Sequence, residues 1–343
     1  MSSLEGTVRR PEGGVVLAPM SQAMGMLPAG VSLPEGALAT AVGNADPLLL
    51  YVPAGVRIPQ PLQLVNKLQR GRAEADISAL TIVLGRDASA KLLVCQHTVG
   101  DVVADTKAVN DNKVEIFLAE GASFDYYDLE ETSEDTMRHS LVSVHQQAGS
   151  KALLDILTLY NGDTHNECRC EFLGEGAELK LYGMAICDRQ RRLRFDTHID
   201  HLVPHCHSDE LYKISASDRA DCSFCGRIKV HEGAVGTEAY QSSRNLLDGT
   251  DARIQARPEL EIYNDDVKCN HGCAIGQLDP MEVFYMRTRG IPEHQARLLL
   301  RQAFMDDVID AITIPALNQR LRLLVERRFA GDSDAACGAC SFQ

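Results

Sequence analysis

The sequence has no tryptophan, and aromatic residues make up only 5% of its 343 positions. Few large side chains are therefore available to fill a single core, whereas small and aliphatic residues are plentiful, which favours many short stacked strands. No run of about eighteen apolar residues occurs, and the N-terminal residues form no continuous hydrophobic segment. Neither a membrane span nor a signal peptide is predicted, and we expect a cytoplasmic protein.

Glycine motifs that bind nucleotides are also missing, because the sequence has neither a G-x-x-x-x-G-K-[ST] run nor a G-x-G-x-x-G run that opens a helix. Basic residues are few: 34 Lys and Arg against 48 Asp and Glu leave a net charge of -14. Such a surface repels phosphate backbones and anionic membranes, so no nucleic acid and no membrane is expected as a partner. The 11 cysteines, an odd number without a secretory signal, are predicted to be reduced thiols.

From Pro47 onward the sequence contains short apolar or alternating runs separated by Gly, Asp and Asn. We predict strands at 48–52, 79–85, 90–97, 113–119, 140–146, 152–160, 167–174, 178–187, 194–203 and 222–231. A turn in which a small or acidic residue precedes Ala recurs between them, as at Asp87-Ala88. Because no long helix intervenes, βαβ units are excluded. A β-solenoid fits best, since small corner residues let successive rungs stack, and a β-sandwich stays open.

The chain divides into four predicted parts. Residues 1–46, rich in Gly, Pro, Ala and Met, form a partly irregular N-terminal lead-in with one short helix. Residues 47–278 form an all-β core. Residues 279–330 form a helical subdomain, because apolar residues recur at helical spacing from Pro280, again after Pro292, and finally over 316–329. Residues 331–343 are predicted to be a disordered tail.

The stretch DDVKCNHG, at the end of the predicted β core, carries Cys269 and His271 two residues apart. In an extended strand this spacing places both side chains on one face. A thiolate and an imidazole that converge in this way suit iron or zinc. The opposing interpretation, which the residues alone favour, is a small buried cysteine beside a hydrogen-bonded turn histidine.

The run from Leu260 to Ile291, LEIYNDDVKCNHGCAIGQLDPMEVFYMRTRGI, resembles the signature of the SufB/SufD family of iron–sulfur cluster assembly proteins, and its HG and GQLD pieces are most similar to the SufD branch. Weaker agreement upstream extends the resemblance over about residues 80–312. The resemblance implies a right-handed parallel β-helix, that is a β-solenoid, with a C-terminal α-helical subdomain. Family members usually carry a longer N-terminal helical domain with a Trp-bearing segment, and functions of that domain are not carried over.

The resemblance also implies a function, that of a non-catalytic scaffold subunit of the SUF system. Such a subunit pairs through its β-helix with a SufB-like paralogue and binds a SufC-like ABC ATPase; a homodimer through the same edge is expected without the paralogue. The family's functional histidine falls on His271, where a transient iron–sulfur cluster is expected in the complex, with Cys269 as a weaker candidate. No cofactor is expected to be tightly bound in the isolated chain. The ATPase contacts are expected on helical residues: Phe284, Tyr285, Arg287 and Arg289.

A rival hypothesis is a metal-dependent hydrolase that uses His198, His201 and His205. Three imidazoles in a short stretch can hold zinc or iron and activate a water molecule. Against this, His198 and His201 are three residues apart and point to opposite faces of a strand, and the H-E-x-x-H pattern is absent. The hydrolase hypothesis therefore ranks below the scaffold.

A third hypothesis is a SufB-like subunit that holds the cluster with its own thiols. Cys222 and Cys225 form a C-x-x-C pair, but within a strand they fall on opposite faces. Cys337 and Cys340 form another pair in the predicted tail, and no second pair stands at zinc-ribbon spacing. The pairs are therefore predicted to be ordinary thiols.

Overall fold

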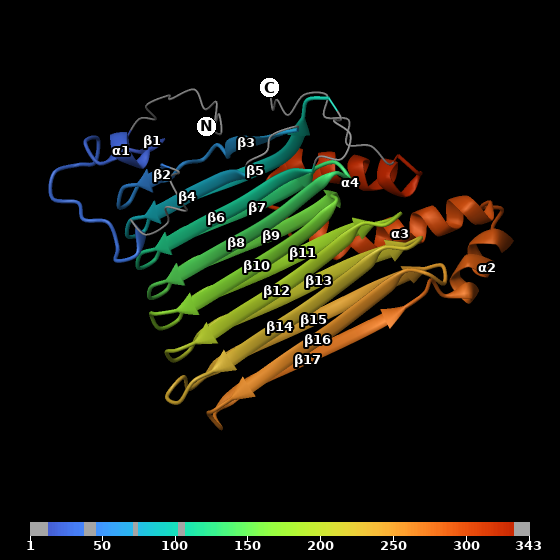
Figure 1. The fold of residues 1–343 in the computed structure, drawn as a ribbon. Helices are drawn as coiled ribbons and strands as arrows, with labels where there is room; N and C mark the ends of the chain where they lie inside the picture. The colour runs from blue at the N-terminus through green and yellow to red at the C-terminus, as the bar shows by residue number, and fades with distance from the viewer. Residues whose placement is uncertain (1–12, 38–45, 71–74, 102–106, 333–343) are drawn as a thin grey trace.

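Consecutive strands alternate between two sheets, so that the chain winds into a parallel β-solenoid of about 8 turns followed by helices (Figure 1). The computed structural model describes residues 13–37, 46–70, 75–101 and 107–332. The predicted β-solenoid is confirmed. The β-sandwich is excluded, because after the first pair of strands every neighbouring pair in both sheets runs parallel.

The two sheets are named here A and B. Sheet A has nine strands in the spatial order β1 (Val16–Pro19), β2 (Leu48–Val52), β4 (Asp76–Leu84), β6 (Ala108–Leu118), β8 (Thr136–Gln146), β10 (Asp163–Phe172), β12 (Arg192–His201), β14 (Asp221–Val230) and β16 (Arg253–Ile262). Sheet B has eight strands, from β3 (Leu62–Gln69) through β5 (Ser89–Val99), β7 (Ser123–Glu131), β9 (Lys151–Tyr160), β11 (Glu178–Cys187), β13 (His207–Ser217) and β15 (Thr237–Asp248) to β17 (Val267–Gly276). Each turn of the solenoid, called a rung below, contributes one strand to each sheet.

Strand register aligns equivalent residues of successive rungs. Thr164 of β10 stands beside Leu193 of β12, which stands beside Cys222 of β14. All three side chains are buried, and the residues between them along each strand are more exposed. Because side chains alternate between the two faces of a strand, these three point into the solenoid interior. The same alternation identifies the interior face of every strand.

Tight corners join the strands where a small buried residue follows a residue with positive φ. Asp87 and Gly121 have φ values of 57° and 68°, and the Ala88 and Ala122 that follow them are 1% and 0% exposed. Corner N–H groups donate to the next corner, as from Gly121 to the Ala148 carbonyl at 2.9 Å. The recurrent turn in the sequence is therefore a solenoid corner, whose buried position accepts only a small side chain.

A buried ion-pair network lies inside the solenoid. Arg138 of β8 is 3% exposed, and its guanidinium donates to the Asp128 carboxylate of β7 at 2.5 Å and to the Asn166 side-chain oxygen of β10 at 3.0 Å. The Glu130 carboxylate lies 3.6 Å from the same guanidinium. Burial raises the pKa of Glu130, and Arg138 opposes the rise. The network thereby joins strands of both sheets through the interior.

The two ends of the solenoid differ. At the N-terminal end β1 pairs antiparallel with β2, and the short helix predicted in this region follows as α1 (Met20–Ala23). At the other end, β16 and β17 have no further strand beside them in the described ranges. Apolar side chains are exposed there, since Ile262, Tyr263 and Ile275 are 44%, 55% and 43% exposed. The last rung, β16 and β17, therefore presents free strand edges together with apolar surface.

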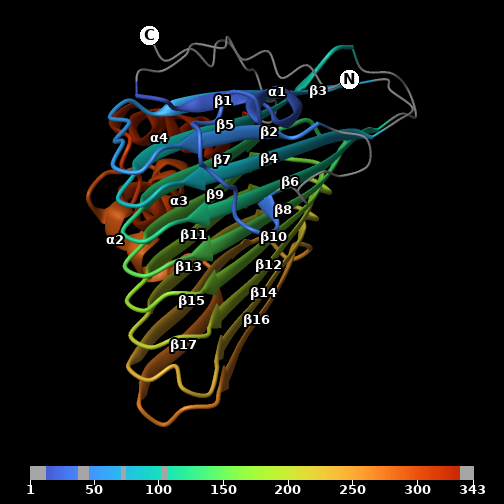
Figure 2. The same cartoon turned by 90° about the vertical axis from the view of Figure 1, so that its left-hand side faces the viewer.

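Three helices follow β17 near their predicted positions: α2 (Pro280–Thr288), α3 (Glu293–Asp310) and α4 (Pro315–Phe329). The last two cover the outer face of sheet B, where Val308 and Leu321 belong to one apolar cluster with Leu157 of β9 (Figure 2). None of the helices in the described part of the chain is both long and apolar enough to cross a membrane. The domain boundaries remain predictions, although β1 shows that residues before 46 contribute to sheet A.

Arg328, near the end of α4, attaches this helix to the solenoid. The residue is 3% exposed, and its guanidinium donates to the Leu159 carbonyl at 2.8 Å. It lies 4.9 Å from the centre of the Tyr160 ring and pairs with Asp188 beyond the end of β11. A buried guanidinium with carbonyl, carboxylate and aromatic partners fixes α4 more firmly than apolar contact alone.

Asp155 of β9 is fully buried beneath these helices, and neither of its carboxylate oxygens has a hydrogen-bond partner among the described residues. Tyr127 and Tyr182 stand on either side of it in sheet B. Burial raises the pKa of Asp155 well above its ordinary value, so the folded protein favours the protonated carboxyl.

The Asp155→Leu variant is expected to be more stable than the wild type by about 1–3 kcal/mol at neutral pH, because an unpaired buried carboxyl is removed. Below the pKa of about 3.9 of an unfolded Asp, the carboxyl is protonated in both states. Above it, only the unfolded chain releases the proton readily, so wild-type stability falls as the pH rises, and the variant should lose this slope. Urea-unfolding midpoints measured from below about pH 3.9 to neutral pH test this expectation, with Asp163→Leu at a partly exposed aspartate as control. Equal dependence of stability on pH in Asp155→Leu and the wild type would contradict it.

Candidate functional site

His271 and Cys269 lie on β17, the terminal strand of sheet B. They stand beside Gln241 and Ala239 of β15, which are both buried toward the solenoid interior. His271 and Cys269 therefore share the interior face of the last rung, as their two-residue spacing predicted. Cys273 lies two residues further along the same face. Cys273 was not among the predicted site residues, although the same spacing rule identifies it.

The three side chains differ in exposure, because the last rung has a neighbouring rung on one side only. Cys269 is partly buried and packs against the interior core, whereas His271 and Cys273 are exposed. Burial raises the pKa of both thiols, which favours their protonated form. In the described part of the chain, no group of three His, Cys, Asp or Glu side chains is arranged to hold a metal ion. The last rung offers donor atoms without a complete ligand set.

A buried polar row leads inward from the position of His271. The Gln241 amide nitrogen donates to the Glu210 carboxylate of β13 at 2.6 Å, and the Thr197 hydroxyl donates to its other oxygen at 2.5 Å. Burial raises the pKa of Glu210 to about 7, and these two hydrogen bonds oppose the rise. Gly226 of β14 leaves room for the amide, since a Cβ atom there would lie 2.4 Å from the Gln241 nitrogen. This row could not be predicted from the sequence, because its members come from four different strands.

The candidate hydrolase residues His198, His201 and His205 do not come together. His198 lies on the outer face of sheet A, and His201, buried in the interior, places its Nε2 atom 2.9 Å from the Ser208 hydroxyl. His205 lies in a corner with a φ of 56°. The prediction that His198 and His201 face opposite sides is confirmed. Burial lowers the pKa of His201 to about 3, so its imidazole is neutral at physiological pH.

The cysteine pairs do not form a site in the described residues either. Cys222 is buried inside the solenoid and Cys225 lies on the opposite face of β14, as predicted. The second pair, Cys337 and Cys340, lies outside the described residues, as does the predicted tail after residue 332.

The predicted ATPase contacts lie on α2. Phe284 and Tyr285 are 57% and 59% exposed. The Arg289 guanidinium lies 5.2 Å from the centre of the Tyr285 ring, and Arg287 pairs with Glu293 at 3.3 Å. Exposed aromatic rings beside arginine are typical of the central residues of protein–protein interfaces.

A short connection joins this helix to the strand that carries His271. Only residues 277–279 separate the end of β17 from the start of α2. The Asp279 carboxylate accepts a hydrogen bond from the Met281 N–H at 2.8 Å, and Pro280 occupies the first turn. Both features fix where the helix begins. A displacement of α2 is therefore transmitted to β17 through very little intervening chain.

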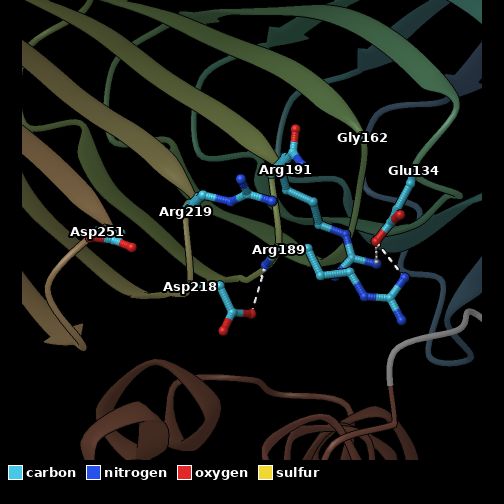
Figure 3. A pocket seen from close by; sticks show the side chains of 8 residues that line it. Glu134, Gly162, Arg189, Arg191, Asp218, Arg219 and Asp251 are labelled. Atoms are coloured by element: carbon cyan, nitrogen blue, oxygen red, sulfur yellow. Dashed lines mark hydrogen bonds and ion pairs between the residues drawn. The ribbon is translucent and has the colours of Figure 1, made fainter.

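A cavity of about 950 Å³ lies at solenoid corners close to the C-terminal helices (Figure 3). Arg189 and Arg191 point toward Glu134 from one side, at 2.7 and 3.1 Å. The other charged side chains of the lining are Arg219, Asp218 and Asp251. The lining thus contains three arginines and three carboxylates. None of the predicted site residues lines this cavity.

The match to known proteins extends over both β17 and α2. Residues 67–304 match the family model described as the SufBD core domain of SUF system FeS cluster assembly. This range covers more than half of the chain and includes the last rung, α2 and most of α3.

Several curated proteins are similar to the chain. An iron–sulfur cluster assembly SufBD family protein of Synechocystis is 28% identical over 294 residues, which cover 83% of this chain and 64% of that protein. The iron–sulfur cluster assembly protein SufD of Escherichia coli is 32% identical over 158 residues, 46% of this chain and 37% of that protein. The protein of the same name in Bacillus subtilis is 26% identical over 283 residues, with coverages of 81% and 63%. The chain thus spans between about a third and two thirds of the length of these relatives.

Proposed function

This chain belongs to the SufBD family of the SUF iron–sulfur cluster assembly system, and on that premise we propose that it is a non-catalytic scaffold subunit on which a nascent cluster is assembled and passed on. Its proposed partners are a SufB-like paralogue and a SufC-like ABC ATPase. The observation that carries the proposal is the open last rung, which presents His271 and Cys269 on its interior face beside free strand edges.

His271 is the proposed contact to the nascent cluster, with Cys269 and Cys273 as neighbouring donors. Imidazole and thiolate are both ligands of iron in proteins. Because no complete ligand set is present in the described chain, the remaining donors are proposed to come from the partner subunit that covers the last rung. Iron and sulfide are the cargo in this proposal, and the chain contributes the surface and some of the donors.

The paralogue is proposed to bind at β16 and β17. Free strand edges and exposed apolar side chains both favour the addition of another sheet, and the last rung has both. Ile275 of β17 and Ile262 of β16 are the apolar side chains that a partner would cover. A second copy of this chain satisfies the same requirements, so a homodimer through the last rung is proposed when the paralogue is missing.

The ATPase is proposed to bind α2 through Phe284 and Tyr285, with Arg287 and Arg289 at the margin. Exposure of two aromatic rings on one short helix supports this choice. The three-residue connection between β17 and α2 supports a mechanical role, because movement of the bound ATPase would reach the strand that carries His271.

Two variants test these surfaces in a single affinity experiment with tagged SufC-like and SufB-like partners. Phe284→Ala with Tyr285→Ala is expected to weaken ATPase binding by about 2–4 kcal/mol, or roughly 30- to 1000-fold, and to leave paralogue binding unchanged. Ile275→Lys is expected to weaken paralogue binding and to leave ATPase binding unchanged, because it would bury a charged side chain in the proposed subunit contact.

Each variant is thus the control for the other, and Leu323→Ala, an apolar residue of α4 that is 57% exposed, controls for general surface effects. A wild-type chain that binds neither partner would overturn the scaffold proposal. If Leu323→Ala weakened ATPase binding as much as the Phe284→Ala and Tyr285→Ala double variant does, α2 would not be the specific ATPase contact.

A further inference from the structure

Gln241 and His271 lie side by side on neighbouring strands of the last two rungs of sheet B. They are register partners in β15 and β17, and both side chains lie on the interior side. Neighbouring strands are about 4.8 Å apart, which brings a glutamine oxygen within hydrogen-bonding reach of an imidazole nitrogen. His271 makes no hydrogen bond to any described residue. Its register partner in the polar row is Gln241.

The Gln241 amide is held in one orientation from the opposite side. Its nitrogen donates to Glu210 at 2.6 Å, and Glu210 is fixed in turn by the Thr197 hydroxyl. Gly226 leaves just enough space for this nitrogen. Because the amide oxygen and nitrogen diverge from the same carbon, the oxygen is directed away from Glu210.

The oxygen of this amide has no hydrogen-bond donor beside it in the described part of the chain. Gln241 is 2% exposed, and its Oε1 atom is buried without a hydrogen-bond partner among the described residues. A buried carbonyl oxygen without a donor is unfavourable, so a donor within reach of it stabilises the site. An imidazole N–H is the donor that the neighbouring rung can supply.

We propose that Gln241 is a positioning residue for His271: when the exposed imidazole turns toward the interior, the unpartnered Oε1 atom accepts a hydrogen bond from one imidazole nitrogen and leaves the other nitrogen free to bind a metal ion. This inference rests on the proposed role of His271 at the nascent cluster. A histidine that binds a metal ion commonly donates its second N–H to an oxygen, which fixes the tautomer and the ring orientation. Glu210 and Thr197 act through Gln241 by holding its amide.

Titration of the isolated full-length chain with Zn²⁺, a redox-inert probe, tests the proposal without any partner. The component of binding that disappears in His271→Ala reports on this site. Gln241→Met keeps the side-chain length but removes the acceptor, and it is expected to weaken that component by about 10- to 100-fold. Gln241→Glu keeps an acceptor oxygen and should retain wild-type affinity, with a proton shared between its carboxyl and Glu210.

A second measurement distinguishes positioning from packing. Imidazole ¹⁵N shifts of His271 are expected to show one tautomer in the wild type and in Gln241→Glu, and a mixture in Gln241→Met. Unchanged Zn²⁺ affinity in Gln241→Met, lost affinity in folded Gln241→Glu, or no His271-dependent binding in the wild type would each overturn the proposal. Should Gln241→Met not fold, Gln241→Glu still decides.

These results are separable from the proposed scaffold function. A chain whose Zn²⁺ binding depends on Gln241 but which ignores its partners would retain the positioning role and lose the scaffold role. A chain that assembles clusters with its partners regardless of Gln241 would retain the scaffold role and lose the positioning role.

Discussion

The Arg138→Met variant is expected to unfold with a free energy about 3–5 kcal/mol lower than that of the wild type. The substitution removes the guanidinium that pairs with Asp128 and Glu130 inside the solenoid, and both carboxylates stay buried without a counter-ion. Methionine occupies a similar volume, so the loss comes from electrostatics and not from a cavity. The midpoint of thermal or urea unfolding measures it.

The pH dependence of this variant identifies the cause. Acid should restore part of the lost stability, because protonation neutralises the uncompensated carboxylates. Arg169→Met is the matched control, since Arg169 pairs with Glu167 on the outer face of β10 and its side chain is 57% exposed. Its effect should stay within about 0.5 kcal/mol. Equal destabilisation by the two substitutions would show that the buried network contributes nothing specific.

In a complex reconstituted with the SufB-like and SufC-like partners, His271→Ala is expected to lower iron–sulfur absorbance about tenfold or more. His271 is exposed in the isolated chain, so its removal should leave the stability of the fold nearly unchanged. Size-exclusion chromatography, read separately from absorbance, should show that the complex still assembles. The site would then lack a donor while its surroundings stay intact.

The control is His139→Ala, a partly exposed histidine on the outer face of β8, which lies four strands away from β16 in sheet A. It should reduce neither absorbance nor assembly. Loss of complex assembly in His271→Ala would make His271 a structural residue of the interface. Full absorbance in His271→Ala combined with loss in Cys269→Ala or Cys273→Ser would favour a SufB-like subunit that holds the cluster with its own thiols.

The solenoid corners and the C-terminal helices could be predicted from the sequence because both depend on local chemistry. A residue that tolerates positive φ, followed by a small residue, is visible at Asp87-Ala88 and again at Gly121-Ala122. Prolines at the start of α2 and α4 mark helix beginnings, and the predicted boundaries differ from the structure by few residues.

Strands β7 and β8 show why the rest could not be predicted. No strand was expected at 123–131, and only the second half of β8 was found. Their interior faces carry Asp128, Glu130 and Arg138, which interrupt the apolar alternation expected of a buried strand. These charges are tolerated because they compensate one another across sheets, and that compensation depends on the register between strands.

The candidate site was likewise predictable from the sequence only in part. A period of two residues was enough to place Cys269 and His271 on one face, and it also identifies Cys273. That this face belongs to an uncovered last rung, and that Gln241 stands behind His271, follow only from the number of rungs and their alignment. The position of the last rung and the pairing of Gln241 with His271 both depend on the fold of the entire solenoid.

If subunits pair through their last rungs as proposed, the difference between the two ends of the solenoid would limit how far an assembly can grow. A pair joined through its last rungs uses that end on both members, so any third subunit would have to join at the N-terminal end. There sheet A finishes in β1, a strand of 4 residues that runs antiparallel and ends in Pro19. Short strands and proline are poor templates for further pairing. Stacked parallel strands could in principle extend into a fibre, whereas the proposed pairing through the last rungs would give a closed pair.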